Sequence, residues 1–94
     1  TATGDDGSLV GVGDAYRQTV RTLQNIERAL RNAGARLEHV VRTRIYVTDA
    51  AHFDGVARAH GEVFGEIRPA STAVVTGLLD PAWKVEMDAD AVIS

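Results

Sequence analysis

The sequence predicts an α+β sandwich of two layers, in which two helices cover one face of a sheet. Three stretches, at 40–48, 68–79 and 84–93, alternate residues with the period of two that is typical of strands. Two further stretches place apolar residues three and four positions apart, as amphipathic helices do. Because the order along the chain is helix, strand, helix, strand, strand, we expect both helices to pack on the apolar face of one sheet.

The first thirteen residues predict a loop. They are rich in Gly, Asp, Ser and Thr and contain a single adjacent apolar pair, Leu9 and Val10. The run Gly-Asp-Asp-Gly-Ser at 4–8 suits a turn. It matches no nucleotide-binding pattern, because such patterns set a glycine-rich loop between a strand and a helix.

A first amphipathic helix is expected to begin after Asp14 and to end at Gly34. Aspartate often caps helix N-termini, and glycine often follows a helix C-terminus. The apolar stripe of this helix consists of Val20, Leu23, Ile26, Leu30 and Ala33. The rest of its surface carries Arg17, Arg21, Arg28 and Arg31. A basic face for nucleic acid is one interpretation, but Glu27 interrupts the arginines and no aromatic residue stacks beside them, so a solvated face is favoured.

The stretch 40–48 is expected to form a strand with one apolar and one polar face. The apolar face holds Val41, Thr43, Ile45 and Val47. The polar face holds Arg42, Arg44, Tyr46 and Thr48. Since side chains alternate across a strand, only the first set can meet the helices.

A second helix is expected to begin after Asp49 and to end at Gly65 and Pro69. Its apolar positions are Phe53, Val56, His60, Val63 and Phe64. Gly61 lies inside this helix, where glycine costs up to roughly 1 kcal/mol against alanine. We therefore expect Gly61 to mark close packing against another backbone.

No metal site is predicted. His52 and His60 are eight residues apart and cannot form the i, i+4 ligand pair of a helical zinc site. Together with His39 they are assigned structural or surface roles. The chain has no cysteine, which removes disulfides, thiolate chemistry and cysteine-ligated zinc.

The last two strands are expected to be neighbours in the sheet, because a turn at Asp80 and Pro81 joins them. In the final strand, the core face is assigned to Val85, Met87, Ala89, Ala91 and Ile93. The uncovered face is assigned to Lys84, Glu86, Asp88, Asp90 and Val92, joined by Val75, Arg42, Arg44 and Tyr46. Such a face is either solvated or closed by symmetric self-association, and the second is favoured because a chain of 94 residues is short of buried area.

The composition argues against nucleic-acid-binding and membrane proteins. The net charge is −3 and no block of like charge is present, so neither nucleic acid nor an anionic membrane is an expected partner. No apolar run approaches the roughly 20 residues needed to span a bilayer, and no basic stretch followed by an apolar one opens the chain. We expect a soluble, cytoplasmic protein.

From about Asp14 onward the chain resembles the Rid family, also called YjgF or RidA-like and labelled endoribonuclease L-PSP or translation inhibitor. The run 22–49 carries the family's Asn-Ile, Leu, Ala-Gly and Val-Val elements in order, ending at an aspartate. Phe64 followed by Arg68-Pro69-Ala70 resembles the family's "F....PAR" segment. Val85-Glu86-Met87-Asp88-Ala89 resembles its "(V/I)E(I/M)EA" segment.

The resemblance implies a chorismate-mutase-like fold with two helices on one face of a mixed sheet. It also implies a homotrimer with its sheets turned inward and small-molecule clefts between adjacent subunits. Two N-terminal strands precede the first helix in the family, so residues 1–12 are expected to supply at most the tail of that hairpin within a single domain of residues 1–94. The family's best-known activity is the hydrolysis of reactive enamines and imines, such as 2-iminopropanoate, without a metal or organic cofactor.

The resemblance also points to site residues. In the family's deaminases the arginine of Pro-Ala-Arg grips the substrate carboxylate with two hydrogen bonds. Here the motif is Pro69-Ala70-Ser71, so Ser71 offers one neutral hydrogen bond, a loss of roughly 1.5 to 3 kcal/mol. Ala73 stands where the deaminases often carry cysteine, and Ala57 where an asparagine is sometimes found.

Glu86 aligns with the family's catalytic carboxylate, which positions water for attack on the imine carbon. Arg68 is a candidate substrate-binding residue, because it is close enough in sequence to swing toward the cleft in place of the missing arginine. Arg44 is a second such candidate on the inward face. Both are more simply interpreted as structural, Arg44 as a partner for Asp88 or Asp90.

Three functions remain open. The favoured one is a small-molecule-binding Rid trimer in which the family's deaminase activity is lost with the arginine. The alternative is an active imine or enamine deaminase, or a related hydrolase, that uses Glu86. A ribonuclease or translation inhibitor is least supported, because the chain offers neither a basic groove nor a histidine pair placed for phosphodiester cleavage.

Overall fold

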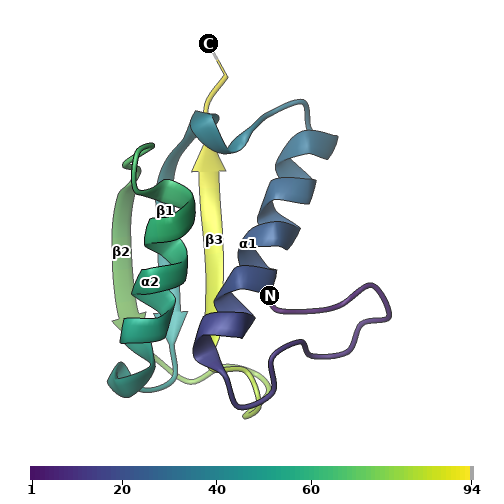
Figure 1. Cartoon of the computed structure of the whole chain (residues 1–94), viewed down its shortest axis with the longest axis vertical. Coiled ribbons are helices and arrows are strands. Elements are labelled where there is room, and N and C mark those ends of the chain that lie inside the picture. Colours follow the sequence, from purple (N-terminus) through teal and green to yellow (C-terminus); the bar gives the residue numbers. More distant parts are fainter. Residues whose placement is uncertain (94) are drawn as a thin grey trace.

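The computed structural model describes residues 1–93 as two helices packed on one face of a three-stranded mixed sheet (Figure 1). The helices are α1 (Ala15–Asn32) and α2 (Phe53–Phe64), and the strands are β1 (Val40–Val47), β2 (Ala70–Val75) and β3 (Val85–Ala91). Two short 3-10 helices, η1 (Leu37–His39) and η2 (Ala50–His52), precede β1 and α2. The predicted fold class and order of elements are confirmed.

The central strand of the sheet is β1. It pairs in parallel with β2 and antiparallel with β3, which gives the order β2-β1-β3. The prediction that the last two strands are neighbours is wrong, because residues 76–84 cross from one edge of the sheet to the other (Figure 1). The β1–α2–β2 segment is a parallel crossover unit, which lays α2 over the sheet.

Both ends of α1 lie at the predicted residues. The Asp14 carboxylate accepts a hydrogen bond from the Arg17 N–H at 3.0 Å, as an N-cap does. At the other end, the Ala35 N–H donates to the Leu30 carbonyl at 2.8 Å, and Gly34 adopts a φ of 84°. This left-handed turn is favoured by glycine and satisfies carbonyls that the last helical turn leaves free.

The approach to α2 also follows the prediction, with one exception. Asp49 accepts a hydrogen bond from the Ala51 N–H at 2.8 Å and so caps η2, which leads directly into α2. Gly65 caps the far end. The expectation of close packing at Gly61 is wrong, because a Cβ at that position would meet nothing within 4 Å. The close approach is at Gly55, where a Cβ would lie 3.2 Å from the Tyr16 backbone nitrogen of α1.

The core lies between the helices and the sheet. Its fully buried members are Leu23, Val40, Ile45, Val47, Val56, Ala59, Phe64, Val85 and Met87. The alternation predicted for β1 holds from Thr43 onward but fails at its start, since Val41 is 49% exposed while Val40 is 3% exposed. A register shift between Val40 and Arg42 explains the difference, because a β-bulge moves the residues before it to the other face.

Two further face assignments are corrected by the strand register. Val75 pairs with the buried Val47, and paired residues share a face, so Val75 lies on the helix side rather than the uncovered side. Its neighbour Val74, which pairs with Tyr46, faces away from the helices instead. Ile93 lies beyond the end of β3 and is 56% exposed, so it is not a core residue in this structure.

Candidate functional site

A hollow of about 290 Å³ opens beside β2, between that strand and α2. Its lining consists of Ile45, Phe53, Ala57, His60, Gly61, Ser71, Thr72 and Ala73. Ser71 and Ala73, the two predicted substrate-binding residues of β2, therefore lie together, with Ala57 opposite them on α2. Packing of a crossover helix on its own parallel strands produces this arrangement.

Two of the lining residues, His60 and Ser71, meet the buried side chain of Thr43. The Thr43 Oγ1 lies 2.7 Å from the Ser71 Oγ and 2.9 Å from the His60 Nε2, while Ser71 Oγ and His60 Nε2 are 3.4 Å apart. The register explains the contact, because Thr43 on β1 is the direct partner of Ser71 on β2. We call Thr43, His60 and Ser71 the hydroxyl–imidazole cluster.

His60 is the site residue that the sequence interpretation missed. Its position on the apolar stripe of α2 suggested a packing role, and the ring does contact Phe64 with 4.8 Å between centroids. A usable signal was its spacing: His60 follows Ala57 by three residues, so both side chains share one face of the helix. That face is turned toward β2.

The hollow offers hydrogen bonds without charge at neutral pH. Burial lowers the pKa of the His60 imidazole, so the ring is neutral near pH 7. None of the lining residues is an arginine, lysine, aspartate or glutamate. The hollow therefore lacks the two-pronged cation that grips a carboxylate strongly.

Glu86 lies elsewhere. It is the register partner of Tyr46, so it faces away from the helices, and β3 is at the opposite edge of the sheet from β2. Its carboxylate accepts hydrogen bonds from the Thr1 hydroxyl at 2.6 Å and the Met87 N–H at 2.9 Å. Within one chain the structure does not bring Glu86 and Ser71 together.

The charge state of Glu86 follows from these contacts. Burial acts to raise its pKa, but the hydrogen bonds from Thr1 and Met87 outweigh burial and leave the pKa below its ordinary value. Glu86 is therefore an anion at neutral pH. Such a group can accept hydrogen bonds from a water molecule and orient it, which is the chemistry assigned to it by the resemblance.

The two arginines considered as replacements do not line the hollow. Arg68 lies in the loop between α2 and β2, is exposed, and has a φ of 56°, which is uncommon for a residue with a Cβ. Arg44 lies on the uncovered face, where its Nε donates to Asp88 Oδ1 at 2.8 Å and its Nη2 contacts Asp90 Oδ1 at 3.4 Å. This confirms the predicted partnership of Arg44 with the acidic residues of β3.

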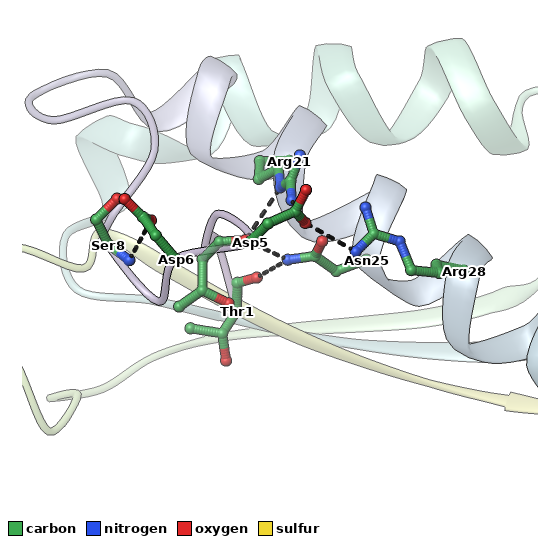
Figure 2. Close-up of polar contacts among 8 residues, drawn as sticks. Thr1, Asp5, Asp6, Ser8, Arg21, Asn25 and Arg28 are labelled. Atoms are coloured by element: carbon green, nitrogen blue, oxygen red, sulfur yellow. Dashed lines mark hydrogen bonds and ion pairs between the residues drawn. The ribbon is translucent and has the colours of Figure 1, made fainter.

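A second hollow, of about 500 Å³, lies between the N-terminal loop and α1. Figure 2 shows Arg21 and Arg28 of α1 both directed toward Asp5, whose Oδ1 accepts hydrogen bonds from them at 3.1 and 3.0 Å. The hydrogen bond and the positive charge of Arg28, and after them those of Arg21, lower the pKa of the Asp5 carboxyl. Asn25 donates to the carbonyls of Thr1 and Thr3 at 2.8 and 2.9 Å and so fixes the loop on the helix (Figure 2).

These pairs bear on the arginines of α1 as well. Because Arg21 and Arg28 share Asp5, and Arg31 contacts Glu27 at 3.1 Å, two carboxylates balance part of the positive charge of this surface. The arrangement favours a solvated helix surface over a basic face for nucleic acid.

Among residues 1–93 no group of three or more His, Cys, Asp or Glu side chains is placed to hold a metal ion. Neither helix described by the structure has the length and apolar character needed to cross a membrane.

Comparison with known proteins places the chain in a family. The family model described as Endoribonuclease L-PSP matches residues 1–93. The 3-aminoacrylate deaminase RutC of Acinetobacter baylyi is 35% identical over 83 residues, covering 88% of this chain and 66% of that protein. A RutC family protein of Pyrococcus abyssi is 38% identical over 79 residues, covering 84% of this chain and 62% of that protein.

Solved structures that are similar to this chain belong to the same family. A YjgF/YER057c/UK114 family member from Mycobacterium tuberculosis is 48% identical with a TM-score of 0.82, covering 85% of this chain and 69% of that one. A YjgF family protein from Neisseria meningitidis is 30% identical with a TM-score of 0.80, covering 84% of this chain and 67% of that one. The chain spans a little under two thirds of the length of the curated relatives named above. On this evidence, the chain belongs to the Rid (YjgF) family.

Proposed function

We propose that this chain is a small-molecule-binding member of the Rid family in which hydrolysis of carboxylate-bearing imines is weak or absent. The observation that supports this most directly is the environment of Ser71. By the resemblance of Pro69-Ala70-Ser71 to the family's Pro-Ala-Arg segment, Ser71 stands in for the carboxylate-binding arginine of the deaminases, and its hydroxyl contacts Thr43 and His60. No cationic side chain lines the hollow to replace that arginine at neutral pH.

We further propose that three copies assemble with their sheets turned inward and form ligand clefts between adjacent subunits. Apolar side chains are exposed along β2 and the start of α2: Phe53, Val74 and Val75 are 39%, 43% and 61% exposed and surround a hollow of about 330 Å³. A neighbouring chain would bury this apolar area. A cleft containing both Ser71 and Glu86 requires two chains, because within one chain they lie at opposite edges and faces of the sheet.

A second function is favoured by a specific observation. The RutC relative, 35% identical to this chain, is a 3-aminoacrylate deaminase, and Glu86 is ionised at the position that resembles the family's water-positioning carboxylate. In this alternative the chain is an imine or enamine deaminase. Glu86 would orient the water that attacks the imine carbon, and release of ammonia would leave a keto compound.

One assay separates the two functions. 2-Iminopropanoate is generated from alanine with an amino acid oxidase, and its hydrolysis is followed with and without the protein. We expect no acceleration by the wild type and a gain of activity in Ser71→Arg, because the guanidinium restores two charged hydrogen bonds to the substrate carboxylate. Thr76→Arg, which adds the same charge just past β2, serves as the matched control.

Wild-type acceleration that disappears in Glu86→Ala would overturn the proposal and support the deaminase alternative. Assembly is tested separately by multi-angle light scattering of the same preparation. A trimer mass supports the intersubunit cleft, and a stable monomer across the accessible concentration range would remove it from both functions.

A further inference from the structure

The hydroxyl–imidazole cluster has one member that can meet a ligand freely and one that cannot. Thr43 is fully buried, whereas Ser71 is exposed to the hollow and His60 is partly so. The Thr43 hydroxyl is within hydrogen-bonding distance of both other members, at 2.7 and 2.9 Å, while Ser71 and His60 are farther apart, at 3.4 Å. Thr43 therefore connects the buried side of Ser71 to the imidazole.

This connection allows two hydrogen-bond arrangements. If His60 Nε2 lacks a proton, Thr43 donates to it and accepts from Ser71, which leaves the lone pairs of Ser71 facing the hollow. If Nε2 carries a proton, it donates to Thr43, which donates to Ser71, and the Ser71 proton is then directed outward. The competing acceptor for that proton, the Pro69 carbonyl, is 3.4 Å away and makes only a weak hydrogen bond.

The charged side chains around His60 are turned elsewhere. On α2 itself, Arg58 lies over the Tyr16 ring at 3.9 Å, and Glu62 accepts a hydrogen bond from the Tyr16 hydroxyl at 2.6 Å. No residue of β2 is titratable. The other titratable or charged residues of the surrounding segments lie on the opposite sheet face or near the ends of α2: Arg42, Arg44, Tyr46, Asp49, His52, Asp54, Glu66 and Arg68.

We propose that this hollow binds a small carbonyl compound at Ser71, and that the protonation state of His60 selects between a neutral amide and a carboxylate. The proposal rests on the function proposed above, because it assigns the ligand of the same site. With a neutral imidazole, Ser71 accepts from an amide N–H or donates to an amide carbonyl, depending on the tautomer. A carboxylate would then gain only one neutral hydrogen bond for the loss of its hydration.

Protonation changes this balance. An imidazolium must donate from Nε2, so Ser71 presents only its proton to the hollow, and the site gains the positive charge that the missing arginine would have supplied. Linkage requires the reverse effect as well: a bound carboxylate must raise the pKa of His60, whereas a bound amide must leave it nearly unchanged.

The test uses butanamide and butanoate, two probes of the same size that differ in charge. Their binding to the full chain is measured by NMR, from the shifts of the His60 ring and the Ser71 amide, at about pH 8 and at a pH below the midpoint of the His60 ring titration, which burial moves below the ordinary histidine pKa of about 6.5; the concentration of butanoate is counted as its anion. We expect butanamide to bind about fivefold tighter than butanoate at the higher pH, and butanoate to gain about tenfold at the lower pH.

Two variants and a control locate the effect. His60→Gln removes the titrating group, and Thr43→Val removes the connecting hydroxyl while keeping the side chain's shape. Both should abolish the tenfold gain of butanoate. His39→Gln, which replaces a histidine outside the hollow, should retain it. A measured His60 pKa that rises on saturation with butanoate and not with butanamide would support the same mechanism independently.

The proposal is overturned if butanoate binds equally at both pH values, if His60→Gln keeps the gain, or if neither probe shifts the His60 and Ser71 signals. The proposed function is tested separately, by the mass of the assembly and by the hydrolysis of 2-iminopropanoate. If the protein is a trimer without that hydrolysis but shows one of these three outcomes, the proposed function stands and only the ligand assignment falls.

Discussion

Gln18 is the buried polar residue whose removal should most weaken this fold. Its side chain is fully buried on α1, where Nε2 donates to the Gly11 carbonyl at 3.3 Å and to the Ala82 carbonyl at 3.1 Å. Its Oε1 accepts from the Lys84 N–H at 2.8 Å. One side chain thus ties the N-terminal loop and the loop before β3 to the helix layer.

Gln18→Ala should destabilise the protein by about 3 kcal/mol, since each of three hydrogen bonds contributes about 1 kcal/mol net. Loss of the buried aliphatic part of the side chain adds to this. With a denaturant slope of about 1.5 kcal/mol/M, typical of a small domain, the urea midpoint should fall by about 2 M. Gln24→Ala is the matched control, because Gln24 is the same residue type on the same helix and is exposed.

The fluorescence of Trp83, the single tryptophan, reports unfolding directly beside the affected loop. Wild type and variants are compared at one protein concentration, because self-association would add to apparent stability. Amide hydrogen exchange gives a local readout, since the Lys84 N–H should lose protection in Gln18→Ala. Equal midpoints for the Gln18 and Gln24 variants, or an unchanged Lys84 exchange rate, would refute the reasoning.

Three further predictions concern the core, a cap and pH. Phe64 is 2% exposed, so Phe64→Ala should cost about 3 to 5 kcal/mol in urea unfolding, and a cost below about 1 kcal/mol would contradict its place in the core. Asp14→Ala should cost about 1 kcal/mol through loss of the N-cap bond, and unchanged thermal unfolding would contradict the cap. Because the His60 pKa is lowered in the folded state, the unfolded chain binds more protons just below about pH 6.5; stability should therefore fall as pH decreases through that range, and His60→Gln should show a smaller fall.

The sequence predicted the local features of this fold well. Asp14, Gly34, Asp49 and Gly65 were placed correctly because a cap depends on a few adjacent residues and on the local backbone. The face assignments of β3 within the strand were also correct, since its alternation is strict. Local rules of this kind need no knowledge of distant contacts.

The sequence did not predict strand order or the face of β2. A run such as Ala70–Val75 has small or apolar residues at every position, so its period leaves open which residues face the helices. If the alternation is assigned one residue out of step, every side chain of the strand is assigned to the wrong face. This error put Val75 on the uncovered face together with Glu86. The position of Val75 on the helix side of the sheet follows only from its pairing with Val47 of β1, which is a long-range property.

The candidate site was predicted in part for the same reason. Alignment to the family motif identified Ser71 and Ala73, which do line one hollow. His60 was missed because an amphipathic pattern treats histidine as a residue of the apolar stripe, and its hydrogen-bond partner is on a strand. Glu86 was identified by its motif, but within one chain it lies at the other edge of the sheet from Ser71, and only the proposed assembly would bring the two together.

The crossover unit has one more consequence. Thr43, His60 and Ser71 come from β1, α2 and β2, the strands and helix of one crossover unit, whereas Glu86 belongs to a strand that follows later in the chain. In the proposed site, the side chains that meet the ligand thus come from one continuous segment, residues 40–75, and Glu86 lies outside it. Substitutions within that segment would change the proposed ligand while leaving the carboxylate of Glu86 in place.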